Sequence, residues 1–125
     1  MGAAAALYGS DPFSVGDVDL LVDRDCAERL SARLGVMFAP GSPSARFRSD
    51  LFGRWCDPPL PVEIMAGFHV RAADRWTEVR PFTRERIEVE GSAVYVPLRA
   101  ELAAMLRLFG RPGDLTRADL LLIER

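Results

Sequence analysis

The sequence predicts a single α+β domain spanning residues 1–125. Short strand-like apolar segments alternate with helical patterns, a Glu90-Gly91 pair separates two strand-like segments, and two amphipathic segments follow near the C-terminus. A chain of 125 residues has room for one modest core. Because 49% of the residues are hydrophobic, we expect the chain to fold. The order of elements leaves an α/β arrangement as the alternative.

The first third of the chain has helix, loop and strand signals in turn. An Ala-rich start favours a short helix, a Gly/Ser/Pro-containing stretch favours a loop, and an apolar run then favours a strand. These predictions cover residues 2–8, Tyr8 to Gly16, and Asp17 to Val22. A second helix is expected over 26–34, with Asp25 as N-cap and Gly35 ending it.

The rest of the chain predicts two middle strands, a hairpin and a helix pair. The strands are expected at Ala45 to Phe52 and Val62 to Met65, and the hairpin at Ile87–Val89 and Val94–Val96. Pro97 marks the start of a helix that Gly110 ends, and Asp114 is expected to cap the last one. The helices are expected to carry apolar residues: Leu98, Leu102, Met105 and Phe109 as core in the first, and Leu115, Leu120 and Ile123 in the second.

Composition excludes several classes of function. A net charge of −2 provides no global attraction to nucleic acid or acidic membranes, so a polyanion site must be local. Cys26 and Cys56 lie far apart, which disfavours a disulfide or zinc site. The sequence has no apolar run of about 18 residues and no signal peptide pattern, so we expect a cytoplasmic protein with no membrane partner.

Two aspartates, Asp17 and Asp19, alternate with apolar residues in one predicted strand. Their side chains point the same way, and carboxylates that close repel each other unless a cation lies between them. Mg²⁺ prefers oxygen ligands, and two such ions can clamp the oxygens of a phosphoryl transfer. Glu63, on a later strand, is a third carboxylate that could activate an attacking hydroxyl. The alternative is that the pair is the wet face of a half-exposed strand, and the pattern alone leaves both open.

The stretch Leu7-Tyr8-Gly9, followed by Gly16-Asp17-Val18-Asp19-Leu20-Leu21-Val22, resembles the signature of minimal nucleotidyltransferases of the DNA polymerase β superfamily. This group includes toxin–antitoxin and aminoglycoside nucleotidyltransferases. Glu63 matches the family's later acid, and the tail from Val96 to Leu115 is similar to its helical end. The resemblance implies a nucleotidyltransferase-like mixed β-sheet flanked by helices. It also implies metal-dependent transfer of a nucleoside monophosphate from an NTP to a hydroxyl acceptor that the sequence does not identify.

The resemblance also implies roles for individual residues. Asp17 and Asp19 would hold two Mg²⁺ ions, and Glu63 would hold the second ion and help deprotonate the acceptor. A Gly/Ser turn would cradle the triphosphate of the NTP with backbone N–H groups. Two placements of that turn stay open: Gly9-Ser10, and Gly2 as the second glycine of a Gly-Gly turn with the Ala-rich helix after it.

The placement at Gly2 leaves the domain without the strand that precedes the turn in this family. That departure motivates an alternative function, a non-catalytic, degenerate interaction module such as a toxin–antitoxin partner. An absent strand would also leave a sheet edge open, which suggests a homodimer.

Other residues favour ordinary structural roles. His69, the lone histidine, is expected at the surface or in packing. Arg46, Arg48 and Arg54 could contact a triphosphate, although a solvated strand face is the more frequent explanation. Packing or an interface is favoured over base stacking for Trp55 and Trp76.

Overall fold

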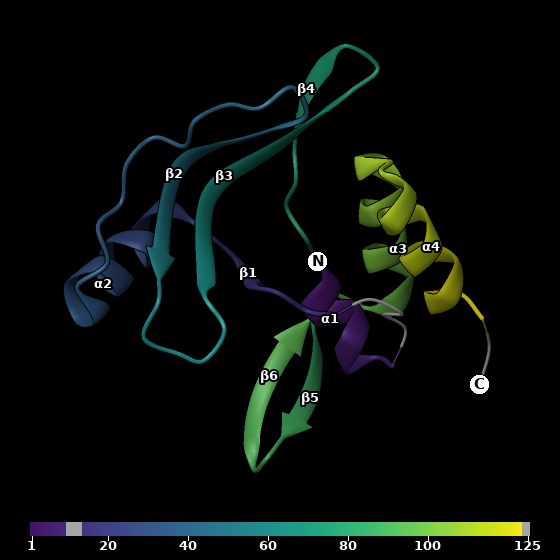
Figure 1. Ribbon diagram of the computed structural model, residues 1–125, viewed down its shortest axis with the longest axis horizontal. Coiled ribbons are helices and arrows are strands. Elements are labelled where there is room, and N and C mark those ends of the chain that lie inside the picture. The colour runs from purple at the N-terminus through teal and green to yellow at the C-terminus, as the bar shows by residue number, and fades with distance from the viewer. Residues whose placement is uncertain (10–13, 124–125) are drawn as a thin grey trace. The chain divides into compact units, whose positions relative to one another are not determined.

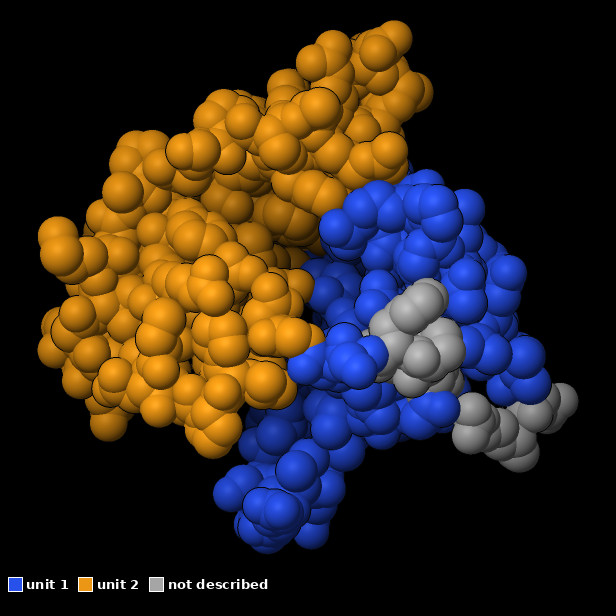
Figure 2. All heavy atoms as spheres, in the orientation of Figure 1, with its two compact units in different colours: residues 1–15, 81–125 blue, residues 16–80 orange. Residues whose placement is uncertain are grey.

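The described part of the chain forms a four-stranded mixed sheet and a separate two-stranded hairpin (Figure 1). The computed structural model describes residues 1–9 and 14–123. The chain forms two compact units, which Figure 2 colours separately: unit 1 combines residues 1–15 with 81–125, and unit 2 comprises residues 16–80. The α+β class is confirmed, whereas the assignment of residues 1–125 to one domain stays a prediction.

The sheet of unit 2 is built around one long central strand, β3. This strand pairs in parallel with β1 and antiparallel with β2, and β4 pairs with its C-terminal part (Figure 1). The strands are β1 (Val18–Val22), β2 (Phe47–Trp55), β3 (Val62–Ala72) and β4 (Arg75–Glu78). The sheet is therefore mixed, as the sequence predicts.

Helix α2 (Arg24–Leu34) packs against β2 and β3. Its N-cap is Asp23, whose carboxylate accepts a hydrogen bond from the backbone N–H of Cys26 at 2.7 Å. The prediction of Asp25 as the cap was wrong: Asp25 lies in the first turn, where its negative charge favours the helix dipole. Gly35 ends the helix in the left-handed region, as predicted, with φ 69°.

One face of the sheet forms the core of unit 2. Ile64, Ala66 and Val70 alternate along β3 and are all buried. At Gly53, which pairs with Ile64, an added Cβ would lie 2.8 Å from Val36 Cγ1, so the segment after α2 closes directly over this face. Because strand side chains alternate, Glu63 belongs to the opposite face.

Strand β3 is much longer than the predicted Val62 to Met65, and β4 was not predicted. Gly67 interrupts the apolar pattern of β3 with φ 63°, and the Asp50 carboxylate occupies the place that a Cβ at Gly67 would take. Ala73 and Asp74 connect β3 to β4 with φ values of 49° and 61°. A turn with these positive φ values usually contains glycine or asparagine. Because Ala73-Asp74 has neither, the sequence gives no signal for this hairpin.

Unit 1 contains helix α1 (Gly2–Leu7), the hairpin β5 (Glu85–Val89) and β6 (Ser92–Val96), and helices α3 (Arg99–Phe109) and α4 (Pro112–Leu121). The predicted hairpin is confirmed. Its turn residues Glu90 and Gly91 both have positive φ, 50° and 83°, as the right-handed twist of a two-residue hairpin requires.

The apolar stripe of α3 is largely the core that the sequence predicts. Leu102, Met105 and Phe109 are buried, and Gly110 ends the helix with φ 75°. The prediction was wrong for Leu98, which is 43% exposed. Leu98 is the N-cap residue, with an extended ψ of 153°, so its side chain does not follow the helical stripe.

Helix α4 differs from its prediction in its cap and in one of the apolar residues assigned to it. It begins at Pro112, and Asp114 is not its cap but a buried side chain, 1% exposed, that pairs with Arg111. Ala118 and Leu121 are also buried, whereas Leu115 is 42% exposed. Of the three apolar residues predicted for this helix, Leu115 and Leu120 lie in it, whereas Ile123 lies beyond its end and is 56% exposed.

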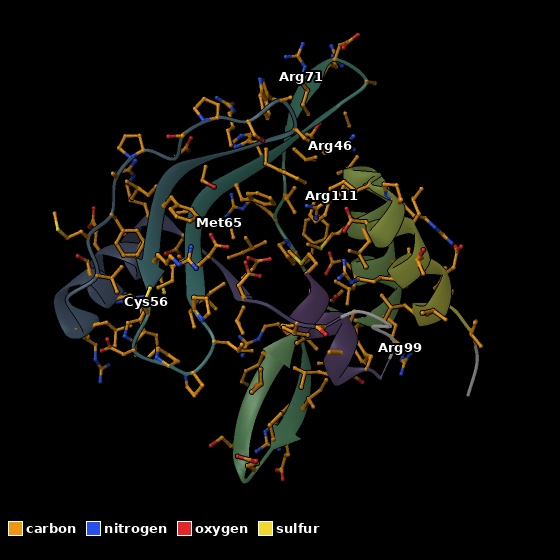
Figure 3. The ribbon with its side chains drawn as sticks, viewed as in Figure 1. Arg46, Cys56, Met65, Arg71, Arg99 and Arg111 are labelled. Atoms are coloured by element: carbon orange, nitrogen blue, oxygen red, sulfur yellow. The ribbon has the colours of Figure 1, made fainter. Side chains whose placement is uncertain are left out.

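Arg99 ties α1 to the helix pair (Figure 3). Its guanidinium lies 4.6 Å from the centre of the Tyr8 ring and donates to the backbone carbonyls of Tyr8 and Leu121. The Tyr8 hydroxyl in turn donates to the Pro97 carbonyl at 2.7 Å. These contacts give Arg99 a structural role in unit 1.

Candidate metal centre

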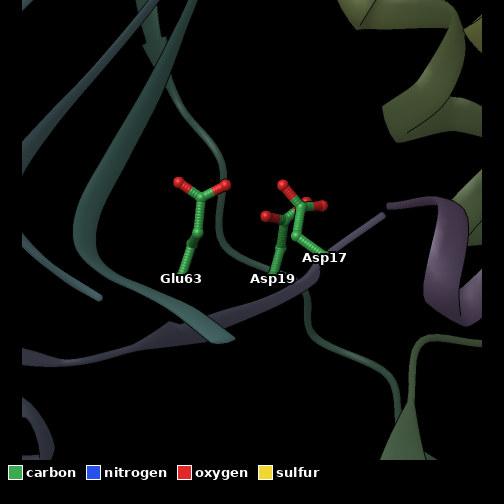
Figure 4. Close-up of side chains that lie close together, drawn as sticks. All are labelled: Asp17, Asp19 and Glu63. Carbon is green, nitrogen blue, oxygen red and sulfur yellow. The ribbon is translucent and has the colours of Figure 1, made fainter. Parts of the chain in front are cut away.

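The parallel pairing of β1 and β3 brings together the three acids that the sequence singles out. Asp19 lies directly opposite Glu63 in the register of the two strands. Asp17 precedes β1 and is two residues before Asp19. Each of the three offers a carboxylate oxygen, and these oxygens all lie within 4.8 Å of one another (Figure 4). Residues distant in sequence thus form one cluster, here called the acidic triad.

The acidic triad retains strong mutual repulsion. The pKa of Glu63 is raised to about 7, first by a hydrogen bond with Asp17, then by partial burial and by the charges of Asp17 and Asp19. Arg54 acts in the opposite direction. A carboxyl group with this pKa holds a proton about half of the time at neutral pH, because the folded protein places it against other carboxylates.

The chemistry of the triad fits a hard divalent cation. Carboxylate oxygens are the ligands that Mg²⁺ prefers, and a cation between the three groups would replace the shared proton and relieve the repulsion. The alternative interpretation, in which Asp17 and Asp19 are the solvated face of a strand, gives no reason for a third acid from another strand to lie beside them. The presence of Glu63 in the cluster therefore favours a metal site. The roles of the three residues as metal ligands and catalytic groups stay predictions.

The residues predicted to bind the triphosphate lie in unit 1, whereas the triad lies in unit 2. Gly2 is the first residue of α1. Gly9 follows that helix with φ 74° and donates its N–H to the Ala6 carbonyl at 2.8 Å, so it ends a helix. Ser10 lies outside the described residues. A turn followed by a helix is the order that the resemblance implies, and Gly2 stands at the start of a helix. Phosphate binding by any of these residues stays a prediction.

Arg54 is exposed and lies beside the acidic triad, a position that the sequence does not predict. For Arg54, as for Arg46 and Arg48, the sequence favours a solvated strand face, with contact to a triphosphate as the alternative. In the structure, Arg54 on β2 lies directly opposite Glu63, on the far side of β3 from Asp19. The signal that could have found it is the register of β2 and β3, which depends on pairing that the sequence does not state.

The other polar candidates have local partners. The guanidinium of Arg48 lies 5.1 Å from the centre of the Trp76 ring. His69 Nδ1 lies 2.7 Å from the carbonyl oxygen of Gly67, two residues earlier in β3. Both contacts belong to unit 2 and fit the packing roles expected for His69 and Trp76.

One solved structure similar to this chain is that of a putative nucleotidyltransferase (TM1012) from Thermotoga maritima. The two share 26% sequence identity with a TM-score of 0.63, over 85% of this chain and 69% of that one. No protein-family model matches the chain, and no curated protein matches its sequence. The structural likeness confirms the nucleotidyltransferase-like fold, whereas the subfamily stays a prediction. In the described part of the chain, every helix is too short or too polar to cross a membrane.

Proposed function

We propose that this protein transfers a nucleoside monophosphate from an NTP to a hydroxyl acceptor, with Mg²⁺ held by the acidic triad. The observation that carries the proposal is the convergence of Asp17, Asp19 and Glu63, whose oxygens lie within 4.8 Å of one another. The likeness to a nucleotidyltransferase of similar fold supports the same class of reaction.

In the proposed reaction, the acceptor oxygen attacks the α-phosphorus of the NTP. A new phosphorus–oxygen bond forms, the bond from the α-phosphorus to the bridging oxygen breaks, and pyrophosphate leaves. Bound Mg²⁺ would supply charge neutralisation for the attacking and leaving oxygens. Asp17 and Asp19 would hold the metal, and Glu63 would also accept the proton that the acceptor hydroxyl loses.

The position of Glu63 suits its proposed role at the acceptor, separate from the role of Asp17 and Asp19 at the metal. Glu63 comes from β3, whereas Asp17 and Asp19 come from the β1 segment, so the acceptor can approach from the β3 side while the phosphates bind the metal. For the triphosphate we propose backbone N–H groups at Gly2, with Gly9-Ser10 as the second placement.

Isothermal titration with an NTP, with and without Mg²⁺, tests the first step. We expect metal-dependent binding that is lost in Asp17→Ala and Asp19→Ala, because removing either carboxylate removes a metal ligand. Incubation with NTPs labelled at the α-phosphate then tests transfer. Asp25→Ala on α2 is the matched control, since this acid lies outside the triad.

Three outcomes separate the possible functions. Metal-dependent binding followed by transfer supports the enzyme. Metal-dependent binding without transfer to any acceptor would indicate the non-catalytic interaction module instead. Equal binding and equal transfer by wild type and both aspartate variants would refute a role for the triad. A homodimer or a toxin–antitoxin partner stays a separate prediction, which size measurement in solution and co-purification would test.

A further inference from the structure

Arg54 places a positive charge immediately beside the acidic triad. Across the sheet, Asp19 on β1, Glu63 on β3 and Arg54 on β2 form a row of directly paired residues. Paired residues on adjacent strands have their Cβ atoms about 5 Å apart and their side chains on one face. The row therefore consists of two carboxyl groups and then a guanidinium, with Glu63 in the middle.

Arg54 is available for a ligand. The residue is exposed, and among the residues that the structure describes its guanidinium has no hydrogen bond or ion pair, although its charge acts on Glu63. Arg48 on the same strand differs, because it stacks on Trp76. A guanidinium binds phosphate or carboxylate with two parallel hydrogen bonds, which makes an exposed, unoccupied arginine well suited to an anion.

The position of Arg54 indicates which of the two substrates it would contact, the acceptor or the NTP. In the proposed function, Asp17 and Asp19 hold the metal that binds the triphosphate, and Glu63 contacts the acceptor hydroxyl. Arg54 lies beyond Glu63, on the side away from Asp19. A group that reaches Arg54 while its hydroxyl contacts Glu63 therefore belongs to the acceptor.

We propose that the acceptor carries an anionic group, a phosphate or a carboxylate, close to its reacting hydroxyl, and that Arg54 binds this group. The inference rests on the proposed function and adds a substrate class and a specificity-determining residue to it. A site built around such an ion pair discriminates strongly against an acceptor that lacks the anion, because the arginine then loses its partner.

Two matched pairs of acceptors test the proposal: glycerol 3-phosphate against glycerol, and lactate against lactamide. With Mg²⁺ and NTPs labelled at the α-phosphate, we expect wild type to label at least one anionic member about 10- to 100-fold faster than its neutral counterpart. The two pairs separate phosphate from carboxylate. Arg54→Gln should remove the preference, and Arg54→Lys should restore part of it. Arg33→Gln, an exposed arginine on α2, is the control that should change nothing.

Binding measurements without an acceptor separate the alternatives. The affinity for an NTP analogue with a methylene bridge between the α- and β-phosphates should be unchanged in Arg54→Gln. Mn²⁺ affinity should change less than about tenfold, because the charge of Arg54 also acts on Glu63. A tenfold loss of analogue affinity would assign Arg54 to the NTP, and a larger change in Mn²⁺ affinity would make it a positioning residue for Glu63. Either result overturns the proposal and leaves the proposed function intact.

The remaining outcomes are also decisive. Equal labelling of neutral and anionic acceptors, or a metal–NTP complex that labels neither anionic probe, overturns the proposal. If wild type does not bind metal and NTP at all, the proposed function fails, and this inference fails with it.

Discussion

Two acidic side chains, Glu101 in unit 1 and Glu63 in unit 2, have opposite kinds of neighbours. In unit 1, Glu101 on α3 accepts hydrogen bonds from the backbone N–H groups of Phe82 and Thr83, both at 2.9 Å, and from the Thr83 hydroxyl. Partial burial opposes its ionisation, but these donors outweigh it and lower the pKa of Glu101. In unit 2, Glu63 contacts another carboxylate, and its pKa is raised to about 7.

This difference shows which carboxylates hold the fold together. Glu101 fastens a loop, and the buried Asp114 pairs with Arg111 at 2.6 Å, so both acids stabilise unit 1 as anions. The triad instead keeps a repulsion that only a proton or a cation can relieve. Removing a charge should therefore weaken unit 1 and strengthen the metal-free unit 2.

The largest effect is expected at Asp114. Asp114→Ala should lower the free energy of unfolding by about 2–3 kcal/mol, because it removes the buried partner of Arg111 and Arg117. Urea unfolding followed by far-UV circular dichroism, which detects α3 and α4, measures this. Asp119→Ala on the same helix is the control: its pair with Arg107 is exposed, so a loss under about 0.5 kcal/mol is expected. Equal losses would contradict the assignment.

Glu63→Gln should have the opposite sign. In metal-free protein at about pH 8, we expect it to raise the free energy of unfolding by about 1–2 kcal/mol, since water screens part of the repulsion at this partly exposed site. Tryptophan fluorescence is the measurement, because Trp55 and Trp76 both lie in unit 2. Glu28→Gln on α2 is the control. A destabilised Glu63→Gln would remove the contrast between the units.

The same group determines a pH dependence. The folded-state pKa of Glu63 is about 7, against an ordinary value of 4.5, so the folded state binds this proton more tightly than the unfolded state. The resulting stabilisation is complete below about pH 4.5 and is lost as the pH rises through about 7. We expect the metal-free wild type to lose stability over that interval relative to Glu63→Gln. Parallel curves for the two proteins would argue against the shift.

Mg²⁺ should reduce the contrast between the units. At ten times its dissociation constant, it should stabilise wild type by about 1.4 kcal/mol. At one fixed Mg²⁺ concentration, the stabilisation should be larger at about pH 8 than at about pH 6, because the cation displaces a proton. Thermal unfolding with increasing Mg²⁺ measures this, and Asp19→Ala should show no such gain. Equal stabilisation of both proteins would place the bound ion elsewhere.

The smallest effect is expected at Glu101. Glu101→Gln should cost about 1 kcal/mol, because the amide would turn its own N–H group toward backbone donors. Chemical unfolding followed by circular dichroism is again suitable. Glu88→Gln, whose ion pair with Arg86 is exposed, provides the comparison and should change stability little.

The sequence predicted those elements whose signals are local. The β5–β6 turn is encoded by Glu90-Gly91, and the ends of α2 and α3 by Gly35 and Gly110. The caps of α2 and α4 were misassigned because an acid near the start of a helix can have a role other than capping. Asp23 and Asp25 stand two residues apart at the start of α2, and either could cap it. Asp114 resembles a cap, but it lies inside α4, where it is buried and pairs with Arg111 and Arg117, each three residues away.

The triad could be proposed from its residue types, but its geometry could not. Asp17 and Asp19 share a strand face by simple alternation. Their approach to Glu63, and the position of Arg54, depend on strand pairings that alternation does not specify. The positions of the acidic residues in the sequence thus indicate a metal site. The direction and register of the strands determine that Arg54 is the basic residue beside it.

The parallel register of β1 and β3 also has a kinetic consequence. Asp19 and Glu63 pair across β1 and β3, and α2 and β2 lie between these strands in the chain. The contact is therefore non-local, and its loop closure is slow. During folding, that closure brings carboxylates toward one another before the remaining contacts compensate for their repulsion. A divalent cation or a lower pH should therefore accelerate refolding of unit 2, and the rate of this step would report when the centre assembles.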